Sequence, residues 1–293
     1  MRRILLTGAG PHGFIGKNIA PQLRAEYELF TSSSRELNLV DYDTTARYLD
    51  EHRIDTVIHG AAQSLIHTGP EDVMLHDLQM FYNLDKLCRQ LDRFLFFGSG
   101  AVFDKRIPID RVTEEDVGRS IPADYYGLCK YIMTLYARQS RNIYNLRLFG
   151  IFGPYEHWQS KFISNLCCKA VYGLPLTVRQ NAIYDFLYVK DLPPIVEWFL
   201  KNEPKYHDYN ICTGMPTDLV TIAKTVREVS GKDLPIEVKA EGWGKPYTAA
   251  NDRLTSETGP LKLHTMEQAI RELYSYYEEH RDEIPEEILK ETR

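Results

Sequence analysis

The stretch that most constrains the fold runs from Arg3 to Asn18, with the sequence RILLTGAGPHGFIGKN. Its apolar run, Ile4 to Leu6, is typical of a parallel strand buried on both faces, and glycines follow it directly. Glycines between a strand and a helix permit positive φ and let the backbone approach a pyrophosphate, which the N–H groups of the helix N-terminus then face. We therefore predict a dinucleotide-binding turn, although a merely flexible strand–helix connection would show a similar glycine pattern. The residues assigned to this site are Gly8, Gly10, Gly13, Phe14, Ile15 and Gly16.

The composition limits the other classes of function. A chain of 293 residues, 43% apolar and 26% charged, can bury one large core or two modest ones. Its formal charge of −6 argues against a nucleic-acid partner held by a general basic field. Because no apolar run reaches the roughly 18 residues of a spanning helix, we expect no membrane partner either.

The cysteines and histidines do not form a metal or disulfide pattern. The five cysteines are odd in number, lack CxxC spacing and stand in apolar contexts, which is typical of reduced cytosolic thiols. The nine histidines show no paired ligand spacing. We therefore predict a cytoplasmic protein without a metal, and we interpret His59 as a core residue.

The second predicted strand, Tyr27 to Thr31, ends where a dinucleotide fold contacts the adenosine ribose. An acidic residue there would accept from a ribose 2′-OH, whereas Arg35 offers a forked cation to a 2′-phosphate, with the Ser33 hydroxyl nearby. This favours NADP, with NAD as the alternative, although a solvated surface arginine would look the same in the sequence. Asp41, at the next turn, is also assigned to the cofactor site.

Strands and helices alternate through the first half of the chain. The elements expected after residue 40 are helices over 41–53, 72–91 and 122–141, and strands over 56–62, 94–97 and 143–148. This alternation predicts a parallel, doubly wound sheet. The strand over 56–62 ends in Gly60, Ala61 and Ala62, whose small size leaves room for a cofactor at the carboxyl end of the sheet.

A proton donor is predicted on the helix over 122–141. Tyr126 and Lys130 are four residues apart and so share one helix face. The lysine ammonium stabilises a phenolate, so Tyr126 can pass a proton to a nascent alkoxide near neutral pH. Ser99, at the end of the preceding strand, is placed to hydrogen-bond the same oxygen. An aromatic core residue beside a surface lysine is the alternative for this pair taken alone.

Several motifs occur in the order and spacing of one enzyme family. They are TGAGPHGFIG, HGAA, GSGAVF, YGLCK, FGP and DFLYVKD. The chain is thereby identified as a member of the extended short-chain dehydrogenase/reductases (NAD-dependent epimerase/dehydratase family) that act on nucleotide sugars, and the likeness covers nearly its whole length. The stretch SSSRELNLVDYD resembles the NADPH-dependent 4-keto-sugar reductases of the GDP-L-fucose synthase type. The resemblance implies a Rossmann domain, a nucleotide-sugar substrate and a homodimer.

Carried over by position, the resemblance implies a catalytic triad of Ser99, Tyr126 and Lys130, with Lys130 also reaching the nicotinamide ribose. Four features depart from the family pattern. The glycine loop has four residues between Gly8 and Gly13 where the family usually has two, so Pro11 and His12 could alter its contact with the pyrophosphate. Gly150 and Asp77 each replace a common Asn, and Tyr184 replaces the arginine of the usual Arg-Asp-Phe.

The second half of the chain is expected to complete the substrate site. The elements expected there are helices over 158–172, 192–200, 219–230 and 265–280, strands over 175–178, 185–189, 209–212 and 236–238, and a solvated charged end over 281–293. We predict an α/β fold with a doubly wound parallel sheet over 1–153, a return segment over about 184–212, and a smaller C-terminal substrate-binding α/β domain over 154–183 and 213–293. Lys161 and Arg179 are candidate diphosphate contacts, although either could be ordinary surface charge.

These observations predict NADPH-dependent reduction of the C4 keto group of a nucleotide-linked 4-keto-6-deoxy sugar, with Tyr126 as proton donor. The alternatives are a nucleotide-sugar 4-epimerase with bound NAD and a non-catalytic NADP-binding regulator. In the GDP-L-fucose synthase pattern, epimerisation uses a cysteine two residues after the catalytic serine and a histidine after the Gly-Pro turn. Ala101 stands at the first position and Lys161, aligned across a gap, at the second. His157 nearby could supply one of the two groups but not both, so we expect reduction without epimerisation.

Overall fold

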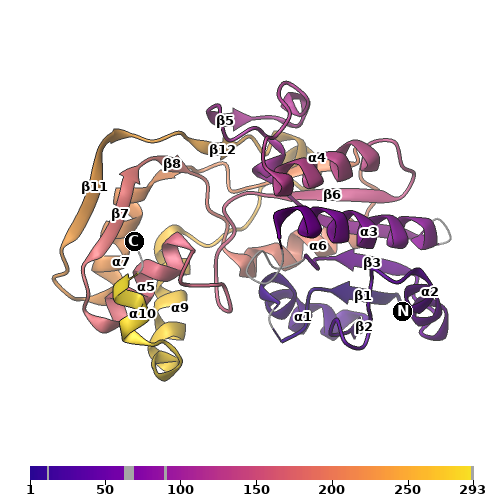
Figure 1. The fold of residues 1–293 in the computed structure, drawn as a ribbon, viewed down its shortest axis with the longest axis horizontal. Helices are drawn as coiled ribbons and strands as arrows, with labels where there is room; N and C mark the ends of the chain where they lie inside the picture. Colours follow the sequence, from indigo (N-terminus) through magenta and orange to yellow (C-terminus); the bar gives the residue numbers. More distant parts are fainter. Residues whose placement is uncertain (12, 63–68, 89–90, 292–293) are drawn as a thin grey trace.

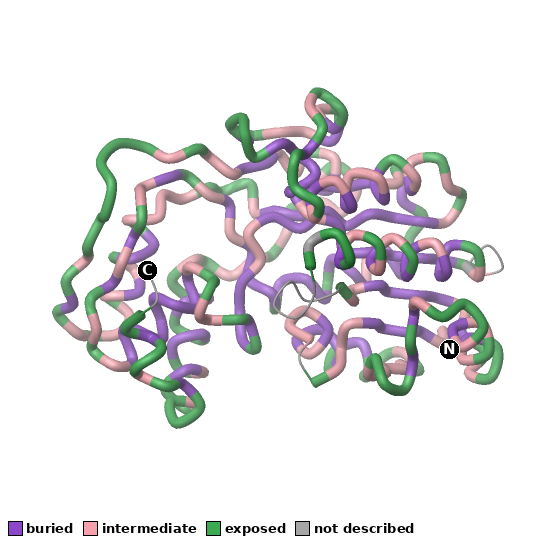
Figure 2. Tube along the Cα trace, in the orientation of Figure 1, coloured by how far each residue is buried: buried purple, intermediate pink, exposed green. Residues whose placement is uncertain are grey.

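The computed structural model describes residues 1–11, 13–62, 69–88 and 91–291. Within these ranges, six parallel strands form the main sheet, which Figure 1 shows beside α1 to α4. In spatial order they are β2 (Glu28–Thr31), β1 (Arg3–Thr7), β3 (Thr56–His59), β4 (Arg93–Ser99), β6 (Ile143–Leu148) and β9 (Asp208–Ile211). The inner strands are buried almost along their whole length, as expected for strands covered on both faces (Figure 2). The predicted doubly wound parallel sheet is confirmed.

Helices cover both faces of the main sheet. On one face, α1 (Phe14–Glu26) and α6 (Leu192–Lys201) share a core with Ile4 and Leu6. The other face carries α2 (Tyr42–Glu51), α3 (Pro70–Cys88) and α4 (Tyr125–Ala137), which share a core with Leu5. The side chains of β1 thus alternate between two cores, as the pleat of a strand requires. Because β2 and β3 flank β1 on opposite sides, the strand order reverses there, and doubly wound sheets bind their ligands outside such a point.

A smaller lobe packs beside the carboxyl edge of the sheet (Figure 1). Its helices are α5 (Phe162–Tyr172), α7 (Leu219–Ser230), α9 (Met266–Glu279) and α10 (Glu286–Glu291), and its parallel strand pair is β7 (Leu176–Asn181) with β11 (Ile236–Trp243). The core of this lobe is formed by apolar side chains of α5, α7, α9 and β7. The smaller α/β unit predicted from the sequence is therefore present.

A third sheet joins the two lobes. Among the described residues it contains, in spatial order, β10 (Thr217–Asp218), β8 (Ile183–Tyr184), β12 (Tyr247–Ala249) and β5 (Ile109–Val112). In the sequence, β5 lies between β4 and α4, whereas the other three strands of this sheet come from the second half of the chain. The following helix α8 (Asp252–Thr258) returns to the main sheet, where Leu254 is buried in the α1–α6 core. The domain boundaries proposed from the sequence stay a prediction.

Two predictions for local elements were wrong. Residues 185–189 do not form a strand: only Tyr188 makes an isolated bridge, and a short 3-10 helix follows at Val189–Asp191. The buried Asp185 carboxylate instead accepts from backbone N–H groups of Thr213 and Gly214, at 2.9 and 2.8 Å. The charged end is not wholly solvated either, because Ile284 and the α10 residue Leu289 are buried in the core of the smaller lobe.

None of the helices in the described ranges combines the length and the apolar character needed to cross a membrane.

Candidate active site

The glycine turn between β1 and α1 is built by close backbone packing. Gly8 has φ +76°, and a Cβ at this position would lie 2.5 Å from the Gly60 backbone. Cβ atoms on Gly13 and Gly16 would lie 1.9 and 2.5 Å from the Gly8 carbonyl oxygen. These contacts exclude side chains at all three positions and leave the first N–H groups of α1 beside a narrow cradle. Since Gly13 precedes α1 without a capping side chain, this helix end fits a pyrophosphate, as a dinucleotide site requires.

The floor of the site is the end of β3. The Thr7 hydroxyl accepts from Gly60 N and Ala61 N at 3.1 and 3.2 Å, and it hydrogen-bonds the His59 ring at 2.8 Å. Burial, together with the charge of Lys130, lowers the pKa of His59 to about 3. His59 is therefore a neutral core residue, as interpreted from the sequence, and it helps to fix the small residues that follow it.

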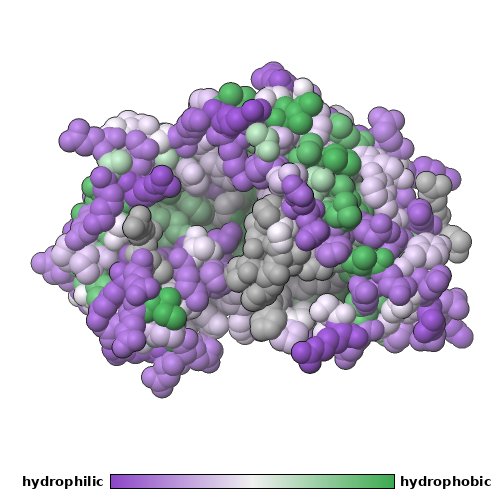
Figure 3. Space-filling model, viewed as in Figure 1, coloured by the Kyte–Doolittle hydropathy of each residue, from purple (hydrophilic) through white to green (hydrophobic). Residues whose placement is uncertain are grey.

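A cleft of about 710 Å³ lies above this floor, and Figure 3 shows the surface hollowed between the two lobes. Of the residues predicted to bind cofactor or substrate or to act in catalysis, those lining the cleft are Ile15, Gly60, Ala61, Ala62, Ser99, Tyr126, Lys130 and Lys161. The structure thus brings the predicted triad into the same cavity as the strand ends beside the glycine turn.

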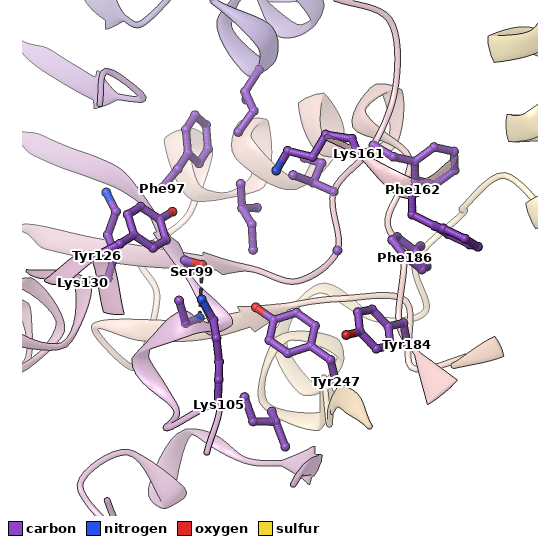
Figure 4. A pocket seen from close by; sticks show the side chains of 18 of the residues that line it. Phe97, Ser99, Lys105, Tyr126, Lys130, Lys161, Phe162, Tyr184, Phe186 and Tyr247 are labelled. Atoms are coloured by element: carbon purple, nitrogen blue, oxygen red, sulfur yellow. Dashed lines mark hydrogen bonds between the residues drawn. The ribbon is translucent and has the colours of Figure 1, made fainter. Parts of the chain in front are cut away.

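The triad residues are positioned by strand and helix ends. Ser99 ends β4 and caps a short 3-10 helix, Gly100–Val102, by accepting from Ala101 N at 3.1 Å. Tyr126 lies in the first turn of α4, and Lys130 follows one turn later with its Nζ 5.7 Å from the centre of the Tyr126 ring. Lys130 is only 5% exposed. Figure 4 shows the Ser99 and Tyr126 hydroxyls facing the same space in the cleft.

The cofactor residues expected around the ribose lie outside this cleft. Both the N–H and the hydroxyl of Ser33 donate to the Glu36 carboxylate, at 2.8 and 2.9 Å, while Arg35 is exposed. Asp41 is the N-cap of α2 and accepts from Thr44 N at 2.9 Å. The Thr44 N–H is also the main reason that the pKa of Asp41 lies below its usual range. The cofactor assignments of these residues stay predictions.

Three other predicted residues occupy different places. Gly10 has room for a side chain, since a Cβ would lie 3.7 Å from Ser33 Cα and 3.9 Å from the Ser32 carbonyl oxygen, which are ordinary contact distances. Phe14 lines a second cavity, of about 480 Å³, on the other side of the glycine turn. Arg179 is exposed on β7, away from the residues found lining the cleft in the described part of the chain. His12, in the lengthened glycine loop, lies outside the described residues.

Sequence reasoning missed most of the substrate-side wall of the cleft. Its aromatic rings are those of Phe162, Tyr184, Phe186 and Tyr247. The Tyr184 ring lies 5.7 Å from Phe186 and 5.6 Å from Tyr247. Tyr184 had been noted only as a departure from the family pattern. Tyr184 and Phe186 are neighbours in the sequence, but Tyr247 joins them only because β12 pairs with β8.

Cations and one buried acid complete the cleft. Lys105 and Lys245 line it together with Lys161, and the Lys245 ammonium donates to the Arg106 carbonyl at 2.7 Å. Glu156 is 7% exposed and accepts from the Ser164 hydroxyl at 2.6 Å. Burial raises the pKa of Glu156 to about 7, against the opposing effects of Ser164 and Lys161.

Residues 4–212 match the model of a protein family described as the NAD dependent epimerase/dehydratase family. The chain belongs to this family. It is thus an enzyme of the NAD(P)-dependent nucleotide-sugar epimerase and reductase type. The chain is 23% identical to a GDP-L-colitose synthase from Yersinia pseudotuberculosis, over 94% of this chain and 97% of that protein.

Solved structures share the fold. A GDP-L-fucose synthetase from Naegleria fowleri bound to NADP aligns with a TM-score of 0.82 at 18% identity, over 95% of this chain and 93% of that chain. A GDP-mannoheptose C4 reductase from Campylobacter jejuni with NADP bound aligns with a TM-score of 0.80 at 15% identity, over 94% of this chain and 98% of that chain. At these identities the likeness shows the arrangement of the two lobes, not the substrate.

Proposed function

We propose that this enzyme uses NADPH to reduce the C4 keto group of a nucleotide-linked 4-keto-6-deoxy sugar. The observation that carries the proposal is the pair of hydroxyls, Ser99 and Tyr126, facing one space in the cleft with Lys130 behind the phenol. The nicotinamide, when bound, supplies a hydride to the carbonyl carbon. This chain must supply a proton to the C4 oxygen and a hydrogen bond that holds that oxygen in place.

The two hydroxyls divide these tasks. Ser99 is held at the end of a buried strand, so its hydroxyl can hydrogen-bond the C4 oxygen as negative charge develops there. Tyr126 then donates its proton to that oxygen. The Lys130 ammonium, buried one turn behind, stabilises the phenolate that remains.

The substrate proposal rests on the other side chains that line the cleft. Ammonium groups of Lys105, Lys161 and Lys245 offer attraction to a diphosphate, and the aromatic rings of Tyr184 and Phe186 offer faces for a sugar or base. The related GDP-L-colitose synthase and GDP-mannoheptose C4 reductase are named for GDP-linked sugars, which makes a GDP-linked substrate the first to test. Arg179 is exposed and is not among the described residues that line the cleft, so it has no part in the proposal.

NADPH is preferred in this proposal because Arg35, in the segment after β2, is exposed. It offers a cation where an NAD site would have an acidic residue for the ribose 2′-OH. Two of the solved structures that share the fold hold NADP. Glu36 acts in the opposite direction, since its carboxylate, held by Ser33, would repel a 2′-phosphate. The preference is thus set by the balance of Arg35 and Glu36.

We also propose that the enzyme works as a homodimer in the cytoplasm. The helices α3 and α4 pack together and carry exposed apolar side chains, with Leu75 64% and Leu135 40% exposed. The thiols of Cys129, Cys167, Cys168 and Cys212 are free and buried, as expected in a reducing compartment. Size-exclusion chromatography with light scattering tests the dimer, and Leu75→Glu together with Leu135→Glu should yield a monomer.

The experiment that tests the function is a turnover panel. The purified enzyme is mixed with NADPH and with 4-keto-6-deoxy sugars linked to GDP, UDP, dTDP or ADP, and loss of NADPH absorbance is followed. We expect oxidation of NADPH with at least one substrate. With the same substrate, Tyr126→Phe should oxidise NADPH at no more than about a hundredth of the wild-type rate. Redox-neutral conversion of a nucleotide sugar by enzyme purified with NAD would support a 4-epimerase instead. NADPH binding without conversion of any substrate would support a regulator.

A further inference from the structure

Tyr247 brings a third hydroxyl into the cleft from the far end of the sequence. It begins β12, which pairs with β5 on one side and with β8 on the other. Its backbone is held on both edges: Pro246 O accepts from Ile109 N at 3.2 Å, and Tyr247 O accepts from Asp185 N at 3.1 Å. The phenol is therefore carried by a strand that both lobes hold in place, not by a surface loop.

The Tyr247 hydroxyl lies beside the catalytic serine. A Cβ on Gly100, the residue after Ser99, would stand 2.4 Å from this hydroxyl, so the phenol fits only because residue 100 has no side chain. The Phe149 ring packs against the Tyr247 ring, with centroids 5.2 Å apart. Figure 4 shows the Tyr247 hydroxyl turned toward the space that Ser99 and Tyr126 face.

The phenol keeps its proton over the working range of an enzyme. Burial and the neighbouring Tyr126 raise the pKa of Tyr247 above its ordinary value, and the nearby Ser99 hydroxyl offsets only part of that rise. A hydroxyl such as Ser99 has one proton and two lone pairs. One lone pair of Ser99 Oγ already accepts from Ala101 N at 3.1 Å.

We propose that Tyr247 is a positioning residue: its phenol, which faces Ser99 without a hydrogen bond to it in this structure, donates to the second lone pair of Ser99 Oγ when the sugar is bound and so directs the Ser99 proton to the sugar C4 oxygen. This inference rests on the proposed function. With Ala101 N and Tyr247 both donating, Ser99 keeps only its proton for the substrate, and it cannot rotate away without breaking a buried hydrogen bond. Tyr247 acts through Ser99 and need not touch the sugar.

A double-mutant cycle tests the proposal. Wild type, Tyr247→Phe, Ser99→Ala and the double variant are compared by kcat, by KM for the sugar nucleotide and by the Kd of NADPH. Tyr247→Phe should lower kcat about five- to tenfold, the effect of one net hydrogen bond, and leave KM and Kd unchanged. In the Ser99→Ala background the same change should have no further effect, because the group it positions is gone. Tyr131→Phe is the matched control, since Tyr131 packs on the same apolar cluster but is not among the described residues lining the cleft.

Two results would overturn the proposal. One is a kcat for Tyr247→Phe equal to that of wild type. The other is an equal loss in the Ser99→Ala background, because Tyr247 would then act without the serine. Gly100→Ala is a second test that can be used if Tyr247→Phe does not fold. Its Cβ should displace the Tyr247 phenol and so lower kcat. If wild type interconverts C4 epimers and reduces nothing, the proposed function fails separately, and the cycle is measured on that reaction.

Discussion

Glu156 should make the folded protein less stable as the pH rises through the neutral range. The raised pKa, about 7 against an ordinary value of 4.5, means that the folded chain holds a proton that the unfolded chain has released. Below pH 4.5 both states are protonated and the group contributes nothing. Between pH 4.5 and 7 the unfolded state ionises first, so the free energy of unfolding falls, by about 3 kcal/mol in total at about 1.4 kcal/mol per pH unit. The full penalty is present above pH 7.

Glu156→Gln removes this penalty while keeping an oxygen that can accept from Ser164. We expect the variant to be within about 1 kcal/mol of wild type at pH 4.5, because the folded wild-type carboxyl is then protonated and both side chains offer Ser164 a neutral oxygen. By pH 8 it should be more stable than wild type by about 2 kcal/mol. Urea unfolding at a series of pH values, followed by tryptophan fluorescence without cofactor, measures the difference. Glu51→Gln, at an exposed position on α2, is the control and should show a difference that does not change with pH.

A difference between Glu156→Gln and wild type that stays constant from pH 4.5 to 8 would refute the reasoning. It would mean that water reaches the carboxylate or that Lys161 neutralises it. Because Glu156 lines the substrate cleft, a diphosphate bound near Lys161 should raise its pKa further, and binding near pH 7 should then take up protons.

Three other predictions concern the reaction itself. NADPH should bind at least about tenfold more tightly than NADH, and Arg35→Ala should abolish that preference while Glu36→Gln increases it, as measured by fluorescence titration; equal dissociation constants in wild type would contradict the assignment. Tyr126→Phe should bind NADPH normally and turn over at least about 10²-fold more slowly, and near-normal turnover would remove Tyr126 from the mechanism. Reduction in D₂O should place no deuterium at C3 or C5 above an enzyme-free control, because Ala101 cannot carry a proton, and NMR of the product would show any exchange that contradicts this.

Predictions from the sequence succeeded where local pattern and tertiary role coincide. The glycine turn of Gly8 to Gly16 is specified by contacts within a few residues of the strand that precedes it, apart from Gly60, and its motif carries that information. The Tyr126–Lys130 spacing likewise fixes which two side chains share a helix face, whatever surrounds the helix. The continuous apolar strands of the main sheet are recognisable because both of their faces are buried.

The failures come from contacts between distant segments. The short strand β5 has only Ile109 buried, and it is a strand because β12 pairs with it. Asp185–Val189 has strand-like composition but does not pair as a strand. Its buried Asp185 carboxylate instead accepts hydrogen bonds from the N–H groups of Thr213 and Gly214. The end of the chain looks solvated by its charges, yet Leu289 supplies apolar surface to a core assembled from α5, α7 and α9. Tyr247 was invisible for the same reason, since nothing near it in the sequence marks its approach to Gly100.

The sheet that joins the two lobes also sets an order for synthesis. Arg111 N donates to the hydroxyl of Thr248, 137 positions later in the sequence, at 2.7 Å. On the ribosome, β5 and the outer edge of β6 therefore emerge long before β12 and β9 exist to cover them. During that interval the nascent chain carries uncovered strand edges, which are templates for pairing with other chains. A gene truncated after α4 should therefore give aggregates rather than a small cofactor-binding protein, because β6, β9 and α8, which complete the first lobe, are encoded after that point.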